Sequence, residues 1–116
     1  MPRVIDLYEG NGASQDLLYS LEYKKGKRIN LKKNDNIPND EIRSCVLHDI
    51  PKGALVRFYD NPDGKMNDDW TEIEVKAPHQ KYIIRTLERT YDDEYVRVTY
   101  HHQNGLDGKV SRIALD

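Results

Sequence analysis

Alternation of apolar and polar positions predicts that this chain is built from short β-strands. In residues 70–75, for example, Thr71, Ile73 and Val75 share one face, and this period of two is typical of a half-buried strand. Turn sequences rich in Gly, Asn, Asp and Pro, such as Asn11-Gly12, separate segments of this kind. The strands expected on this basis are residues 4–8, 17–23, 29–31, 43–47, 55–59, 70–75, 82–87, 95–101 and 110–115.

Three landmarks of the first half of the chain recur in the second half at nearly one spacing. They are an aromatic-acid pair, a strand that ends in lysine, and an acidic turn. The corresponding residues are Tyr8 and Tyr59, Glu22 and Glu74, and Asp40 and Asp93, which lie 51, 52 and 53 positions apart. Because a constant spacing indicates a repeat, we interpret the 116 residues as two copies of one unit.

The order of strands and turns in each unit resembles the Greek-key motif of the βγ-crystallin superfamily. The aromatic-acid pair and the glycine of the family's first hairpin are matched by Tyr8-Glu9 with Gly12 and by Tyr59-Asp60 with Gly64. The resemblance covers residues 4 to about 100. It implies one all-β domain, residues 1–116, folded as a βγ-crystallin-like sandwich of two Greek-key motifs, about residues 3–49 and 53–116. Residues 110–115 would form an extra C-terminal strand.

The acidic turn of each unit resembles the family's six-residue calcium signature, which reads Asn/Asp, Asn/Asp, any, any, Ser/Thr, Ser. The matching residues are Asn39, Asp40 and Ser44 in the first unit and Asp92 and Asp93 in the second, where Val96 and Arg97 depart from the pattern. In the first unit Arg43 stands where the family uses a hydroxyl. A guanidinium there would repel a cation, or would pair with the same carboxylates and substitute for the ion.

The resemblance implies two calcium sites, each joining the acidic turn of one unit to the first hairpin of the other. Calcium takes roughly six to eight oxygen ligands, which is more than one short turn supplies. The implied ligands are Asp40, the Glu41 carbonyl and Asp60 in the first site, and Asp93, the Glu94 carbonyl and Glu9 in the second. A bound ion would tie the halves together and stabilise the folded protein. The alternative is that these turns are solvated, since Asn and Asp tolerate tight backbone geometry.

His101 and His102 suggest a separate hypothesis, because imidazole suits zinc, nickel or copper. Adjacent strand residues point to opposite faces, so the two rings could share an ion only at a bend, which the turn at residues 103–105 offers. The alternative is an exposed pair at a strand end. A further acidic run, residues 67–71, matches the calcium signature through its fifth position, but it precedes a hairpin strand and we interpret it as a chance similarity.

Composition limits the partners that can be expected. The formal net charge is −2 and Lys and Arg are scattered among acids, so no basic stripe predicts binding to nucleic acid. No apolar run approaches the roughly 20 residues of a membrane helix, and the N-terminus lacks an apolar signal core. Cys45 is the only cysteine, which fits a reducing compartment and a packed core position. We therefore expect a cytoplasmic protein that binds neither nucleic acid nor a membrane.

Three functions from different classes agree with these observations. No Gly-rich phosphate loop, zinc-ligand spacing or nucleophile elbow occurs in the sequence, so we expect no enzymatic activity. The first function is a non-enzymatic module with degenerate calcium clamps, in which the ion stabilises the domain. The second is a metal-independent structural or stress protein of the same fold, in which Arg43 replaces the ion by an internal ion pair. The third is a protein-binding module such as an inhibitor or a small toxin.

Overall fold

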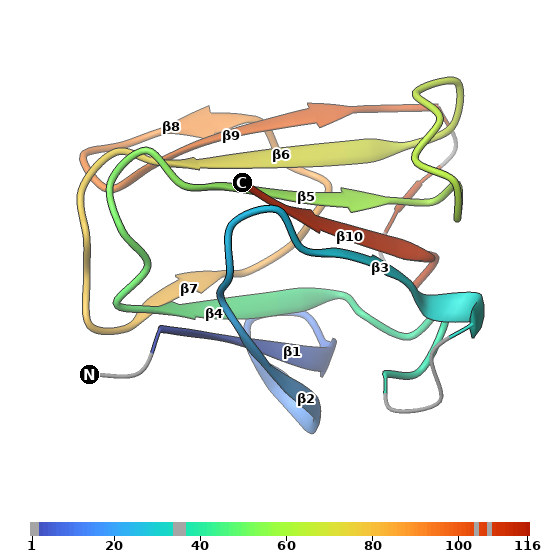
Figure 1. The fold of residues 1–116 in the computed structure, drawn as a ribbon, viewed down its shortest axis with the longest axis horizontal. Coiled ribbons are helices and arrows are strands. Elements are labelled where there is room, and N and C mark those ends of the chain that lie inside the picture. The colour runs from blue at the N-terminus through green and yellow to red at the C-terminus, as the bar shows by residue number, and fades with distance from the viewer. Residues whose placement is uncertain (1–2, 34–36, 104, 107) are drawn as a thin grey trace.

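The computed structural model describes residues 3–33, 37–103, 105–106 and 108–116, and within these ranges the chain forms two facing antiparallel sheets (Figure 1). The first sheet contains, in spatial order, β2 (Ser14–Glu22), β1 (Val4–Gly10), β4 (Ser44–His48) and β7 (Tyr82–Ile84). The second contains β3 (Arg28–Asn30), β10 (Arg112–Leu115), β5 (Leu55–Tyr59), β6 (Trp70–Val75), β9 (Val96–His101) and β8 (Tyr91–Asp92). A short 3-10 helix, η1 (Leu31–Lys33), follows β3. In the described part of the chain no helix has the length and apolar character needed to cross a membrane.

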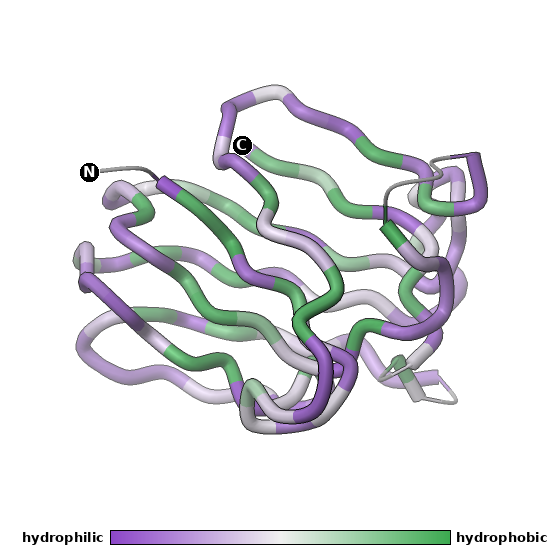
Figure 2. The backbone as a smooth tube through the Cα atoms, turned by 90° about the horizontal axis from the view of Figure 1, so that it is seen from below, coloured by the Kyte–Doolittle hydropathy of each residue, from purple (hydrophilic) through white to green (hydrophobic). Residues whose placement is uncertain are grey.

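Alternating burial along the strands builds a core between the two sheets, and the prediction of an all-β protein is confirmed. On β6, Thr71, Ile73 and Val75 are buried and the positions between them stay partly exposed, as the sequence pattern predicted. Phe58 is the largest of the fully buried side chains. Cys45 is a free, fully buried cysteine, and burial raises the pKa of its thiol, so it is an unreactive core residue. Figure 2 shows hydrophobic and hydrophilic segments alternating along the strands.

Each half of the chain sends one strand to the sheet of the other half, because β3 joins the second sheet and β7 joins the first. The first sheet has the order β2-β1-β4-β7, and four neighbouring strands of the second sheet have the corresponding order β6-β5-β10-β3. Backbone hydrogen bonds repeat this correspondence, because Arg43 N donates to Tyr8 O at 3.0 Å and Ser111 N donates to Tyr59 O at 2.8 Å. The strands β1, β2, β3 and β4 are therefore equivalent to β5, β6, β7 and β10.

The structure corrects the expected position of the added strand. From the sequence, residues 95–101 were predicted to be the last strand of the second unit and residues 110–115 to be an extra strand. Instead, β10 lies between β5 and β3, as β4 lies between β1 and β7, and the added elements are β8 and β9 at the outer edge of β6. The reason is that β9 alternates as a half-buried strand does and follows an acidic turn similar to the one before β4, so local sequence does not distinguish an inserted hairpin from a returning strand. β7 also ends at Ile84, before the expected end at residue 87.

Candidate functional site

The loops that precede β4 and β10 are joined to each other at one end of the sandwich, on the right in Figure 1. Asp40 N donates to Val110 O at 3.1 Å, and Gly108 N donates to Ile42 O at 2.9 Å. Asp40 and Gly108 both have a left-handed backbone, with φ of 63° and 77°. The two hydrogen bonds are equivalent when the halves are exchanged, so Gly108 is the structural counterpart of Asp40.

Carboxylates from both halves act on Asp60, which follows β5 at this end of the molecule. Burial raises the pKa of Asp60, and the charges of Asp68, Asp69 and Asp40 raise it further, while Lys109 opposes them. The structure thus brings Asp40 and Asp60 into one electrostatic neighbourhood. The ionised form of Asp60 is therefore disfavoured there, first because burial removes it from water and then because neighbouring carboxylates repel it.

The loop that carries Asp40 also supplies oxygen acceptors. Asp40 Oδ1 accepts the hydroxyl of buried Ser111 at 3.3 Å, and this contact joins the two halves of the chain. The Oδ1 atom of Asn39 is buried and accepts no hydrogen bond within the described ranges. Glu41 follows Asp40 with an exposed side chain. No three His, Cys, Asp or Glu side chains among the described residues are arranged to hold a metal ion, so a cation would take ligands from other oxygens as well.

The structure does not bring Glu9 together with Asp93 and Glu94, the residues expected to form the second clamp. Tyr82 donates its hydroxyl hydrogen to Asp93, and strand pairing through β4 places Tyr82 level with Ile5. Glu9 lies four residues further along β1, about 13 Å away at the usual rise of a strand. The reason is that Asp93 and Glu94 belong to the turn of the inserted β8–β9 hairpin, which lies at the opposite end of the sandwich, on the left in Figure 1.

Asp93 acts as a turn former in this hairpin. Its Oδ1 atom accepts the backbone N–H groups of Tyr95 at 2.9 Å and Val96 at 2.8 Å, and its own carbonyl accepts Lys76 Nζ at 2.6 Å. Burial would raise the pKa of Asp93, but the hydrogen bonds from Tyr82 and from these two amides lower it below its ordinary value. The carboxylate oxygens of Asp93 are therefore occupied by hydrogen bonds from Tyr82 and from the turn itself. The side chain of Glu94 is exposed to solvent.

In the second half, a glycine and a lysine stand at the positions that correspond to Asp40 and Glu41. The equivalent pairs are Asp40 and Gly108, Glu41 and Lys109, and Ser111 and Arg43. A Cβ atom placed on Gly108 would lie 3.0 Å from Nη2 of Arg43, so the guanidinium packs against the glycine. The position of Asp40 thus has no carboxylate counterpart, and a guanidinium occupies the space beside it.

His101 and His102 are not brought to a common site. The ring of His101 stacks on Trp70 with centroids 4.0 Å apart, and Trp70 in turn stacks on Tyr59 at 5.7 Å. His102 Nδ1 lies instead 2.9 Å from the hydroxyl oxygen of Tyr100. The two imidazoles therefore have different aromatic partners.

Asp69 is a structural carboxylate that sequence reasoning did not single out, although it belongs to the acidic run at residues 67–71. Its side chain is fully buried. It accepts the backbone N–H groups of Gln103 and Gly105, both at 2.7 Å, and the hydroxyl hydrogen of Tyr100. Asp69 therefore fixes the segment that follows β9 and leads to the loop containing Gly108.

Comparison of the chain with family models, with curated proteins and with solved structures finds no match. The class of protein is therefore described from the structure alone. It is an all-β protein of two facing antiparallel sheets, in which each half lends a strand to the sheet of the other and acids of both halves meet at one end.

Proposed function

We propose that the chain is a non-enzymatic module of the βγ-crystallin type in which one loop clamp binds a calcium ion weakly and is stabilised by it. We call the group formed by Asp40, Asp60 and Ser111 the clamp. The observation that carries the proposal is the meeting of the two loops, where Asp40 Oδ1 accepts the Ser111 hydroxyl and where burial, and then neighbouring carboxylates, raise the pKa of Asp60.

The strand order supports the Greek-key part of this proposal. In a Greek key, the fourth strand returns by a long connection to lie beside the first. β4 lies beside β1, which lies beside β2, and β10 lies beside β5, which lies beside β6. In both units the third strand crosses to the other sheet, so the two units are interlocked and a ligand between their loops would act on the whole domain.

The chemistry of the clamp fits a hard cation that prefers oxygen. Two carboxylates, one hydroxyl and the buried amide oxygen of Asn39 are available, and Asp68 acts on Asp60 from the same side. Backbone carbonyls and water would complete the roughly six to eight ligands of calcium. Because few carboxylates contribute and Lys109 offsets Asp60, we expect a Kd on the order of 0.1 to 1 mM, as in weak extracellular calcium modules.

A second candidate function, a metal-independent structural protein of the same fold, is favoured by the position of two cations. The charge of Lys109 lowers the pKa of Asp60, as a bound cation would. Arg43 packs against Gly108 in the other half. In this alternative the protein's own side chains neutralise the loops, and calcium has no effect. The two functions therefore differ in one measurable property, the response of the folded protein to the ion.

Thermal unfolding with calcium, with magnesium and with a chelator tests the proposal, together with calorimetric titration of calcium. The wild type should melt at a higher temperature with calcium, and Asp60→Asn should lose this response. Asp63→Asn is the matched control, because Asp63 is an exposed carboxylate in the same β5–β6 loop and should keep the response. If neither heat nor a melting shift is found for the wild type, the calcium function is wrong and the metal-independent function stands.

A further inference from the structure

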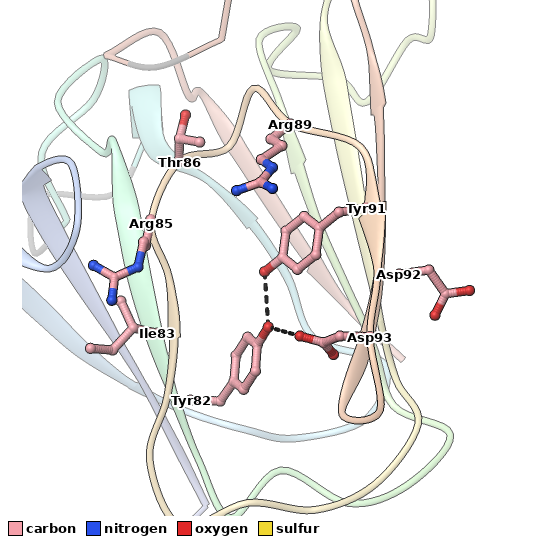
Figure 3. A pocket seen from close by; sticks show the side chains of 8 residues that line it. All are labelled: Tyr82, Ile83, Arg85, Thr86, Arg89, Tyr91, Asp92 and Asp93. Atoms are coloured by element: carbon pink, nitrogen blue, oxygen red, sulfur yellow. Dashed lines mark hydrogen bonds between the residues drawn. The ribbon is translucent and has the colours of Figure 1, made fainter.

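A cleft of about 420 Å³ lies between the free edges of the two sheets, where β7 ends the first sheet and β8 ends the second (Figure 3). One continuous segment, from β7 through residues 85–90 to β8, forms its walls. Tyr82 and Tyr91 bridge the two edges, with their hydroxyl oxygens 3.2 Å apart. The cleft therefore depends on the β8–β9 hairpin, which is the part of the chain that the repeated strand order does not explain.

The acids of the cleft are already compensated. Asp93 accepts the Tyr82 hydroxyl and two backbone amides. Asp92 pairs with Lys76 and, at 3.3 Å, with Arg97, and Figure 3 shows its carboxylate pointing away from the cleft. These carboxylates therefore present no unbalanced charge to a ligand.

The arginines of the cleft have no such compensation. Within the described ranges no carboxylate forms an ion pair with Arg85 or Arg89. The Arg89 guanidinium lies 5.1 Å from the centre of the Tyr91 ring and points into the cleft in Figure 3. Arg85 also lines the cleft, but Figure 3 shows its guanidinium directed away from it, and Nη1 lies 3.8 Å from a Cβ position built on Gly12. The uncompensated charge of the cleft is therefore positive.

We propose that this cleft binds a small organic anion, whose phosphate or carboxylate group is held by Arg89 and whose remainder lies against Tyr82 and Tyr91. A guanidinium presents a planar fork of donors that matches both kinds of oxyanion. The volume falls within the range of about 300–1,000 Å³ that is usual for small-molecule sites. Arg89 stacked on Tyr91 is also held in place before a ligand arrives, which lowers the entropic cost of binding.

The two tyrosines suit a site for an anion because they remain neutral. Burial raises the pKa of Tyr82, and the hydrogen bond to Asp93 adds to this effect. Burial also raises the pKa of Tyr91. Neither phenol adds negative charge at physiological pH, and the Tyr82 to Asp93 hydrogen bond fixes the distance between the two sheet edges.

Titration of the ¹⁵N-labelled protein with three related sugars tests this proposal at constant ionic strength. The probes are glucose 6-phosphate, which carries a phosphate, glucuronate, which carries a carboxylate, and glucose, which is neutral. We expect saturable shifts of the amides of residues 82–93 with one or both charged sugars at millimolar concentration and none with glucose. The charged sugar that binds more tightly identifies the group that the cleft prefers.

Variants decide whether Arg89 is responsible. Arg89→Gln should weaken binding by about tenfold or more, the loss expected when a charge-assisted hydrogen bond is removed. Lys25→Gln removes the same charge from an exposed turn and should leave binding unchanged. The proposal is overturned if no charged sugar gives saturable shifts at residues 82–93, if glucose gives the same shifts, or if a correctly folded Arg89→Gln variant binds like the wild type.

Discussion

Replacing Asp60 by Asn removes one negative charge from the crowded end of the sandwich. In the ion-free protein that charge is unfavourable, because burial and then Asp68 raise the pKa of Asp60 above its ordinary value of 3.8. An acid with a raised pKa in the folded state costs stability once it is ionised, and the cost vanishes below 3.8, where the carboxyl is protonated in both states. The ion-free wild type should therefore lose stability relative to Asp60→Asn as the pH rises from below 3.8 through the raised pKa.

The expected size of this effect is small, and calcium reverses its sign. Asp60 is partly exposed, so solvent screens the repulsion, and exposed charge pairs are worth about 0.2–1 kcal/mol. A cost of about 0.5 kcal/mol corresponds to about 2 °C in Tm for a domain of this size. At a free calcium concentration about ten times Kd, the wild type should gain about 1.4 kcal/mol, or about 5 °C, and the variant should gain nothing.

Scanning calorimetry between about pH 3 and pH 7, with chelator or with calcium, measures the difference in Tm between the wild type and Asp60→Asn in both states. With chelator at neutral pH, Asp60→Asn should melt above the wild type, and the difference should disappear in acid. With calcium at neutral pH, the order should reverse. Asp63→Asn removes a charge from the same loop and should show neither effect. Equal melting of the wild type and Asp60→Asn under all conditions would refute the assignment of Asp60 as the crowded carboxylate.

Three further variants test the architecture of this end of the molecule. Lys109→Gln removes the cation that offsets Asp60, so calcium affinity should rise about twofold to fivefold in calorimetric titration, and an unchanged affinity would mean that Lys109 does not compete with the ion. Arg43→Ser combined with Gly108→Asp copies the clamp into the second half, and a second calcium ion should bind per chain, because aspartate already adopts this left-handed backbone in the first half. An unchanged stoichiometry would contradict the equivalence of the two loops. Asp69→Ala leaves two backbone amides without their acceptor, at about 1–3 kcal/mol each, so urea denaturation should show a loss of at least about 2 kcal/mol. A loss below about 0.5 kcal/mol would indicate that water replaces the carboxylate.

The strands themselves could be predicted because the information for them is local. On β6 the buried and exposed residues alternate along the strand, and that alternation is visible in the sequence. The pairing of strands is not local. β10 has neighbours on both edges and buries Ile113, Ala114 and Leu115, whereas β9 alternates more regularly and follows an acidic turn. Local pattern therefore favoured β9 as the returning strand, and only the complete sheet identifies β10.

The same distinction separates the two candidate sites. Asp40 and Asp60 stand in turns whose residue types and repeated spacing are visible in the sequence, and in the structure the charge of Asp40 adds to the causes that raise the pKa of Asp60. Arg85 and Arg89 belong to no motif. They line one cleft only because an edge of each sheet converges there through Tyr82 and Tyr91. A site that depends on the convergence of two sheet edges leaves no signal in the spacing of residues.

The difference between the two halves limits what calcium can do for this protein. Two equal clamps would hold two ions, but Gly108 has no carboxylate and Arg43 lies against it, so one clamp remains. Lys109, which stands in the place of Glu41, acts on Asp60 of its own half. The second half thus carries a counter-charge for its own carboxylate, and in the proposed function the ion and Lys109 are alternatives for Asp60. We therefore expect the domain to fold without calcium, and we expect the ion to add stability only at concentrations high enough to compete with this ammonium group.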